Sequence, residues 1–351
     1  MAEIRESELK KQIAADTLSG VYFLYGEENY MVSTWARRLI QKAAGKKFLD
    51  FNSQHFSGDV SADSLNDAVQ ALPFMARRKC VAVSDLTLDS RSPSENRKLK
   101  ELLQDVPETT VLVLYFAVSK PPIQKEKKWK EIYAICKECG TCLYCPRRTQ
   151  SDLEKMLMTM AGKRGCHLAR PEANRIFRYV GDDMTALLNE LEKVCAYTGS
   201  GEITAETVDR LVTRNLEARI YDLSKALLAG RHEQAYRILG QLLEQNEQPV
   251  RILAALSSAY VDMYRVRTAL QSGETALEPA SHFEEYRRRE FRLTNAEKNI
   301  HHLSTQMLRI SLDVLLQADL NLKSSRTDSE LILEQTLARL MLIANGEEKS
   351  A

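Results

Sequence analysis

Four cysteines lie close enough together in the sequence to form a metal-binding site. The stretch CKECGTCLYC places Cys136, Cys139, Cys142 and Cys145 in the pattern C-x2-C-x2-C-x2-C. Thiolates at this density can bind zinc or an iron–sulfur cluster. The same stretch, however, is predicted to be a helix that ends at a glycine and then a short strand. Because side chains alternate along a strand, Cys142 and Cys145 would point to opposite faces. We therefore expect packed, reduced thiols, with a metal site as the alternative.

A second candidate chemistry is phosphate binding in the loop after the first predicted strand. A P-loop reads GxxxxGK[ST], in which glycine lets the backbone approach phosphate, lysine supplies charge and the hydroxyl binds magnesium. Counted from Gly26, the last three positions are Met31, Val32 and Ser33, so only the hydroxyl is kept. Two glutamates follow Gly26 directly and would repel a triphosphate. A later strand ends in one carboxylate, Asp85, where the chemistry calls for a pair. Two interpretations stay open: a nucleotide-binding architecture without its chemistry, or an unrelated parallel α/β domain.

The elements that must position these residues alternate between two hydrophobic periods. Strands are predicted at 21–26, 48–56, 80–86, 109–118 and 141–145, and helices at 29–44, 61–72, 94–106 and 124–140. Strands that alternate with helices indicate crossover units and a mostly parallel sheet. Near-continuous apolar strands such as VLVLYF indicate that both faces of the sheet are covered.

Strand signals nearly vanish after Pro146, so we place a domain boundary there. Short helices separated by glycines are predicted to about residue 212, and longer helices follow. The expected fold is an α/β domain (1–146), a small helical domain (147–212) and an all-α domain (213–351). Within the last domain, the charge run at 286–289 and the pair His301-His302 are predicted to be solvated faces.

Charge and hydropathy exclude several classes of protein. The 351 residues contain 49 basic and 48 acidic side chains, so the net charge is +1. This balance argues against a strongly basic nucleic-acid coat, and any DNA contact must come from a local patch. The N-terminus lacks the apolar core of a signal peptide, and no segment approaches the ~18 apolar residues of a membrane span. We expect a cytoplasmic protein without a membrane partner.

The junction QALPFMARRKCVAV, residues 70–83, raises a separate question, because Phe74 and Met75 lie where the chain should face water. Pro73 cannot continue a helix without losing a hydrogen bond and clashing with the preceding turn. Large apolar side chains in such places are more often folded back onto the core than exposed. The alternative is that they are presented to a partner.

Four stretches together carry a resemblance to a known family. They are VYFLYGEENY, QALPFMARRKCVAV, IYDLSKALLAGRHEQAYRILGQLLEQNEQPVRIL and DLNLKSSRTDSELILEQTLARL. In order and spacing they resemble the delta subunit family of bacterial DNA polymerase III, whose members are clamp-loader subunits that open the sliding clamp. The resemblance covers essentially the full length. It implies an AAA+ like first domain that has lost nucleotide binding, a small helical lid domain and a helical collar that joins the subunits of a pentamer.

The resemblance also implies a site. In the family, a helix tip of the first domain places apolar residues in a hydrophobic pocket of the clamp. The positions that match this tip are Leu72, Pro73, Phe74 and Met75. Many relatives have a second aromatic residue where this chain has Met75. Three basic residues follow and could steer the protein toward an acidic rim, which would affect the association rate more than the residence time. They are Arg77, Arg78 and Lys79.

The resulting hypothesis is a non-catalytic subunit of the DNA polymerase III holoenzyme, without catalytic, cofactor-binding or metal-binding residues. The implied partners are the sliding clamp, the motor ATPase and delta-prime subunits of a hetero-pentamer, and primed DNA in the assembled complex. The alternative is a nucleotide-binding or metal-binding regulatory protein on an AAA+ like scaffold. Binding of ATP, or a metal retained through purification, would distinguish the two.

Overall fold

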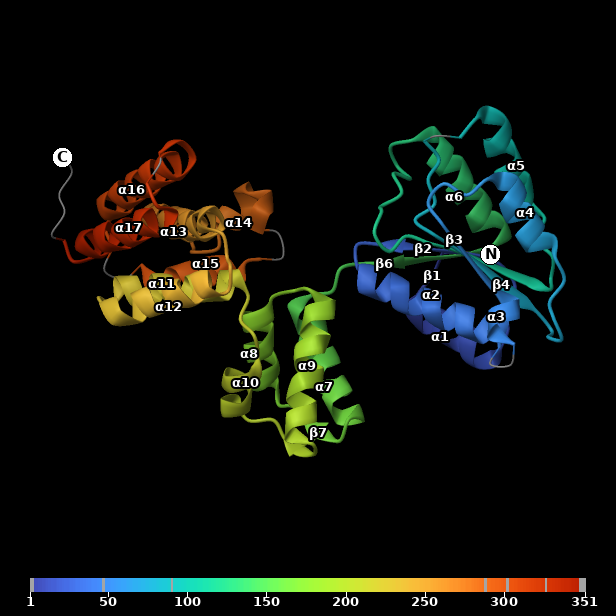
Figure 1. Ribbon diagram of the computed structural model, residues 1–351, viewed down its shortest axis with the longest axis horizontal. Coiled ribbons are helices and arrows are strands. Elements are labelled where there is room, and N and C mark those ends of the chain that lie inside the picture. Colours follow the sequence, from blue (N-terminus) through green and yellow to red (C-terminus); the bar gives the residue numbers. More distant parts are fainter. Residues whose placement is uncertain are drawn as a thin grey trace. The chain divides into compact units, whose positions relative to one another are not determined.

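The computed structural model describes residues 3–45, 48–89, 91–286, 289–300, 303–325 and 327–346. The chain divides into two compact units, Met1–Arg148 and Thr149–Ala351, and each is described by itself (Figure 1). Arg287, Arg288, His301 and His302, which we predicted to be solvated, lie outside the described residues. Within the described part of the chain, no helix is both long and apolar enough to cross a membrane.

The first unit is built on a six-stranded parallel sheet with the order β1-β6-β2-β5-β4-β3. Its strands are β1 (Glu3–Ile4), β2 (Gly20–Gly26), β3 (Ser53–Ser57), β4 (Lys79–Ser84), β5 (Thr110–Tyr115) and β6 (Thr141–Cys145). Its helices are α1 (Glu6–Ala15), α2 (Asn29–Ala44), α3 (Leu49–Asn52), α4 (Ala62–Gln70), α5 (Pro93–Gln104) and α6 (Lys127–Cys139). The predicted parallel sheet with crossover helices is thus confirmed.

Two hydrophobic layers cover the sheet, one on each face. Tyr22 and Leu24 of β2 pack with α1 and α2, whereas Val21 and Phe23 pack with α4, α5 and α6. Figure 1 shows these two sets of helices on opposite sides of the sheet. Alternation along the strands explains the division, because successive side chains point to opposite faces. The sheet is therefore buried on both faces, as its apolar strands predicted.

The strand predicted at 48–56 is wrong in its first half, because residues 49–52 form the single helical turn α3 and β3 starts at Ser53. Phe48 and Phe51 are three residues apart, a spacing that suits one turn of helix as well as an irregular strand. The short β1 and α1 are additions that the polar N-terminal sequence did not indicate. Leu9 anchors α1 by its complete burial.

The helix predicted at 61–72 begins as expected and ends earlier. The Ser61 side chain caps α4 by accepting a hydrogen bond from the amide of Ser64, and the helix ends at Gln70. The backbone turns out of the helix at Ala71, whose ψ is 144°. Helical geometry is also disfavoured at Leu72, the residue before Pro73, so the helix cannot resume there. The strand predicted after this junction begins at Lys79.

The second unit is almost wholly helical, as predicted for the chain after Pro146. Its first helices are α7 (Gln150–Lys163), α8 (Arg170–Val180), α9 (Met184–Thr198) and α10 (Ala205–Leu211). A two-stranded parallel sheet of β7 (Cys166–His167) and β8 (Gly201–Glu202) was not predicted. The core of this region contains the completely buried side chains of Leu157, Ile176 and Leu191.

The remaining helices share one extended hydrophobic core. They are α11 (Leu216–Leu228), α12 (His232–Glu244), α13 (Pro249–Gln271), α14 (Pro279–His282), the 3-10 turn η1 (Glu284–Tyr286), α15 (Phe291–Asn299), α16 (Thr305–Ser324) and α17 (Ser329–Ala344). The separation of the first unit from the second, between Arg148 and Thr149, lies two residues from the predicted boundary. The further division at residues 212 and 213 stays a prediction.

Candidate partner-docking site

Large apolar side chains are exposed just after α4. Leu72 is 84% exposed, Phe74 48% and Met75 77%, while Pro73 is half-buried. We call these four residues the docking surface. The interpretation that Phe74 and Met75 fold back onto the core does not fit these exposures. Large side chains exposed together in this way are typical of surfaces that bind a partner.

Asn52, at the end of α3, fixes the backbone of Phe74 from both sides. The Phe74 amide donates to Asn52 Oδ1 at 2.7 Å, and Asn52 Nδ2 donates to the Phe74 carbonyl oxygen at 2.9 Å. Asn52 is itself buried. Met75, the next residue, has a φ of 46°, in the left-handed region that large side chains rarely adopt. The loop after α4 therefore holds one defined conformation instead of fraying.

Three phenylalanine rings meet at this point, and we call Phe48, Phe51 and Phe74 the aromatic patch. The centroids of Phe51 and Phe74 lie 5.2 Å apart, and those of Phe48 and Phe74 lie 5.5 Å apart in an edge-on arrangement. Phe51 is 68% exposed. The sequence did not single out Phe48, Phe51 or Asn52, because 48–56 was predicted to be a strand. The three-residue spacing of the two phenylalanines was the available signal.

The three basic residues after the docking surface have different environments. Arg77 is exposed, whereas Arg78 and Lys79 are buried. The Arg78 guanidinium donates to the Asp16 carboxylate and to the carbonyl oxygens of Asp16 and Leu18. Lys79 Nζ donates to the Ala68 carbonyl oxygen in α4, and burial lowers the pKa of Lys79. Electrostatic steering does not fit Arg78 and Lys79, whose charges are bonded inside the domain. Only Arg77 keeps that expected role.

The loop that would bind phosphate is bonded to the end of β6. The amides of Glu27 and Glu28 donate to the Cys145 carbonyl oxygen at 2.9 and 3.2 Å. Gly26 approaches so closely that a Cβ at this position would lie 2.1 Å from the same oxygen. Amides at this place, at the start of α2, are the groups with which a P-loop cradles phosphate. Here both amides instead donate their hydrogen bonds to a backbone carbonyl oxygen.

Two further positions, at which a nucleotide-binding protein would have a lysine and an acidic pair, make contacts within the domain here. Val32, in the place of the P-loop lysine, is completely buried in the layer between α2 and the sheet. The Asp85 carboxylate accepts hydrogen bonds from the amides of Val118 and Ser119 and from the Ser119 hydroxyl, at 2.8–2.9 Å. The single carboxylate found where the nucleotide pattern calls for a pair thus fixes the loop after β5.

Three of the four clustered cysteines are divided between the two layers. Cys142 packs on the side of α6 and Cys145 on the side of α2, which confirms the alternation expected from the sequence. Cys136 is buried as well, whereas Cys139 is exposed. Burial raises the pKa of Cys142 and of Cys145 to about 12, which disfavours the thiolate that a metal needs. Among the residues that the structure describes, no group of three or more potential ligands is placed to hold a metal ion.

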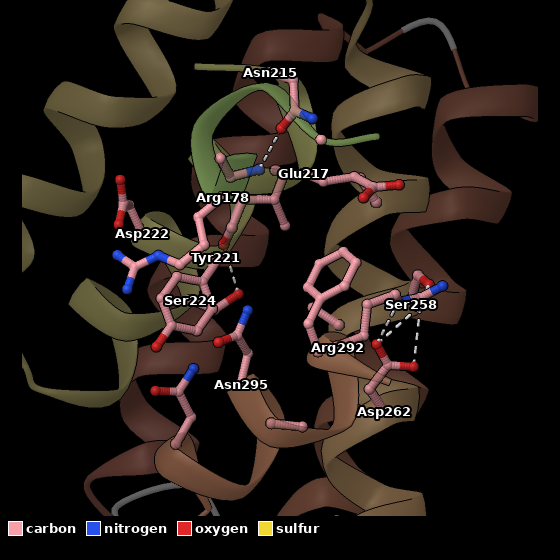
Figure 2. A pocket seen from close by; sticks show the side chains of 18 of the residues that line it. Arg178, Asn215, Glu217, Tyr221, Asp222, Ser224, Ser258, Asp262, Arg292 and Asn295 are labelled. Atoms are coloured by element: carbon pink, nitrogen blue, oxygen red, sulfur yellow. Dashed lines mark hydrogen bonds and ion pairs between the residues drawn. The ribbon is translucent and has the colours of Figure 1, made fainter. Parts of the chain in front are cut away.

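The second unit contains a cavity of about 170 Å³ between α8, α11, α13 and α15 (Figure 2). At one side of it, Asp262 accepts hydrogen bonds from Tyr286 Oη at 2.7 Å and from Arg292 Nε at 2.9 Å. At another, Asn215 caps α11 through the Ala218 amide. These polar groups join the surrounding helices to one another, which is a structural role.

Comparisons with known proteins agree in both halves of the chain. A family model described as "DNA polymerase III, delta subunit" matches residues 22–139, and one described as "DNA polymerase III delta subunit, C-terminal domain" matches residues 217–340. The chain is 24% identical over 341 residues to DNA polymerase III subunit delta of Bacillus subtilis, covering 94% of this chain and 95% of that protein. It is 21% identical over 324 residues to the Escherichia coli subunit of the same name, covering 92% and 91%.

The fold is similar to a solved structure. The B. subtilis DNA clamp loader delta protein superposes with a TM-score of 0.62 at 22% sequence identity, covering 95% of this chain and 99% of that one. The expected fold class is thus confirmed along nearly the whole length. The two family models lie in different units, and the full-length relatives carry the same name as the models. The chain belongs to the DNA polymerase III delta subunit family.

Proposed function

We propose that the protein is a clamp-loader subunit without catalysis of its own, which binds and opens a sliding clamp so that the clamp can be loaded onto primed DNA. Membership in the delta subunit family supports this role. The observation that carries the proposal is the docking surface, where Leu72, Phe74 and Met75 are exposed on a loop held by Asn52. A rigid loop that presents apolar side chains is suited to a preformed apolar pocket on a partner.

The expected gain from this contact is large enough to anchor a complex. Burying Leu72 and Phe74 in a preformed pocket should contribute roughly 2–4 kcal/mol at typical transfer values. Pro73, between them, restricts the backbone and so lowers the entropy lost on binding. Arg77 is exposed beside the loop and could attract an acidic rim, with an effect mainly on the association rate.

The second unit is proposed to join the protein to the other subunits. We infer partners that comprise the motor ATPase and delta-prime subunits of a hetero-pentamer, with residues 213–351 as the collar. Exposed leucines on the last two helices support an interface there. They are Leu316, Leu320, Leu331 and Leu342. The same role implies contact with primed DNA in the assembled complex, and a location in the cytoplasm, where bacterial DNA is replicated.

A double substitution tests the docking surface. Leu72→Ala with Phe74→Ala should weaken binding to the organism's own sliding clamp by about tenfold or more, measured by surface plasmon resonance. Both side chains are exposed, so the melting temperature should stay nearly unchanged. Val118→Ala, an equally exposed apolar residue of the same unit, is the matched control and should bind normally. Normal clamp binding by the double variant would refute the proposed docking surface.

A further inference from the structure

We propose that the clamp contact has two segments: Phe51 on α3 touches the clamp beside Phe74, and Asn52 is a positioning residue that presents Phe74. The inference rests on the proposed function and extends it to a part of the chain that the sequence assigned to a strand. It makes α3 a recognition element and identifies one buried carboxamide as the group that sets the geometry of the site.

The exposed apolar surface of the first unit is concentrated in these two segments. Among its described residues, eight large apolar side chains are exposed, and six of them come from 48–51 and 72–75. The segments are continuous in space, because Phe74 contacts both Phe48 and Phe51 through ring packing. A partner that covers Phe74 therefore meets the Phe51 ring at the same time. The protein that we propose to cover Phe51 is therefore the same one that binds the docking surface, the sliding clamp.

The rings of Phe51 and Phe74 offer one shared apolar face. Their centroids are 5.2 Å apart and their planes differ by 34°, so the two rings are tilted toward a common direction rather than set edge-on. Phe51 is more exposed than Phe74, at 68% against 48%. A ring this exposed adds little to the stability of the free domain, whereas its burial against a partner would remove a large apolar area from water. Aromatic side chains of this kind are typical anchors of interfaces.

The buried carboxamide of Asn52 connects the two segments through hydrogen bonds to their backbones. Its Nδ2 donates to the carbonyl oxygens of both Phe48 and Phe74, at 3.2 and 2.9 Å, while its Oδ1 accepts from the Phe74 amide. Because Asn52 is 1% exposed, it cannot touch a partner and must act through the residues that it holds. The loop from 71 to 78 has no helix or strand of its own. Without these bonds the loop would have to be ordered at the moment of binding, at a cost in affinity.

The test uses full-length protein and the isolated sliding clamp in surface plasmon resonance. Phe51→Ala should weaken binding by about fivefold or more, mainly through faster dissociation, since a lost contact shortens residence time. Asn52→Ala should weaken it by a similar factor. Val118→Ala, exposed in the same unit and outside both segments, is the control and should bind like the wild type.

A double-mutant cycle separates positioning from general destabilisation. If Asn52 acts by presenting Phe74, the loss caused by Asn52→Ala should largely disappear when Phe74 is already alanine. A merely structural role would lower affinity by the same factor in both backgrounds. If Asn52→Ala does not fold, Asn52→Asp takes its place in the cycle, because it keeps the acceptor for the Phe74 amide and loses the donor.

The outcomes distinguish the inference from the proposed function. If Phe74→Ala weakens binding while Phe51→Ala binds normally, or if the cycle shows no coupling between Asn52 and Phe74, the inference is overturned and the proposed function stands. If Phe74→Ala and the Leu72, Phe74 double variant both bind normally, the proposed function fails and the inference with it.

Discussion

Leu72, Phe74 and Met75 face solvent although burying a side chain of this size is worth about 1.5–3 kcal/mol. The chain keeps them outside by bonding the backbone around them. Asn52 holds Phe74 on one side. At the other end of the loop, Lys79 Nζ donates a hydrogen bond to the Ala68 carbonyl oxygen in α4. Polar groups with satisfied hydrogen bonds thus support the apolar surface that we propose to bind the clamp.

The cysteines give a prediction at the same scale. Burial raises the pKa of Cys80, Cys142 and Cys145 to about 12. At pH 8 these groups are far below that pKa and remain protonated thiols, which are poor nucleophiles and poor metal ligands. Cys139 is the exposed member of the set. A chromogenic disulfide reagent should therefore react rapidly with one of the seven thiols in the native protein, and with the rest only after unfolding.

Elemental analysis completes this prediction. Protein purified without chelators should contain no stoichiometric zinc or iron, since Cys142 and Cys145 lie on opposite faces of the sheet. Rapid reaction of several native thiols, or one metal ion per chain, would show that the clustered cysteines form a site after all.

Among the elements, the parallel pairing of β2 with β6 brings the loop after β2, where a nucleotide phosphate would bind, against the end of β6. In a parallel sheet, ligands bind outside the carboxyl ends of strands whose connections run to opposite sides. β2 and β5 form such a pair here, because α2 follows β2 on one face and α6 follows β5 on the other. The architecture thus provides the place beside β5, but on the other side of β2 the amides of Glu27 and Glu28 are already bonded to the Cys145 carbonyl oxygen of β6.

This arrangement predicts that the isolated protein does not bind or hydrolyse ATP. Phosphate would have to displace a backbone carbonyl from two amides and would gain no lysine, since Val32 is buried in its place. Isothermal titration calorimetry with ATP and Mg²⁺ should show no binding, and phosphate release should equal that of buffer. A dissociation constant in the micromolar range would contradict the prediction.

On the scale of the whole molecule, the protein consists of units that have their own hydrophobic cores. The layers of the first unit come entirely from residues 1–148, and the core from α11 to α17 comes from the second. Arg148, the last residue of the first unit, pairs with Glu6 at 2.5 Å and so belongs to that unit by contact as well as by sequence. Separate cores are what independent folding of parts requires.

Truncation tests the division of labour between the units. A fragment of residues 1–148 should bind the sliding clamp with nearly the affinity of the full chain, because the docking surface and Asn52 are complete in it. The same fragment should fail to join the other clamp-loader subunits in gel filtration, because it lacks the proposed collar. Entry of the fragment into the hetero-pentamer would show that the collar assignment is wrong.

The sequence by itself determined the elements whose signals are local. The period of the apolar residues predicted α2 at its observed bounds, and the continuous apolar runs predicted β4, β5 and a covered parallel sheet. These predictions succeed because the spacing of apolar residues along a helix or strand is a property of neighbouring positions. The missing P-loop lysine could also be seen directly, since a residue type needs no fold to be identified. Phe48 and Phe51 of the aromatic patch were missed because the four residues of α3 are too few to show a period.

Only the tertiary structure decided which polar and apolar groups face water. Arg78 and Lys79 are charged and follow an exposed loop, so the sequence indicated a steering surface. Arg78 is buried because Asp16, 62 residues away in the sequence, accepts its hydrogen bond. Lys79 is buried because the Ala68 carbonyl oxygen, 11 residues away in α4, accepts its hydrogen bond. Exposure of Phe74 likewise depends on Asn52, 22 residues away. Burial and hydrogen bonding are settled by contacts between distant segments, and no local pattern records which segments will meet.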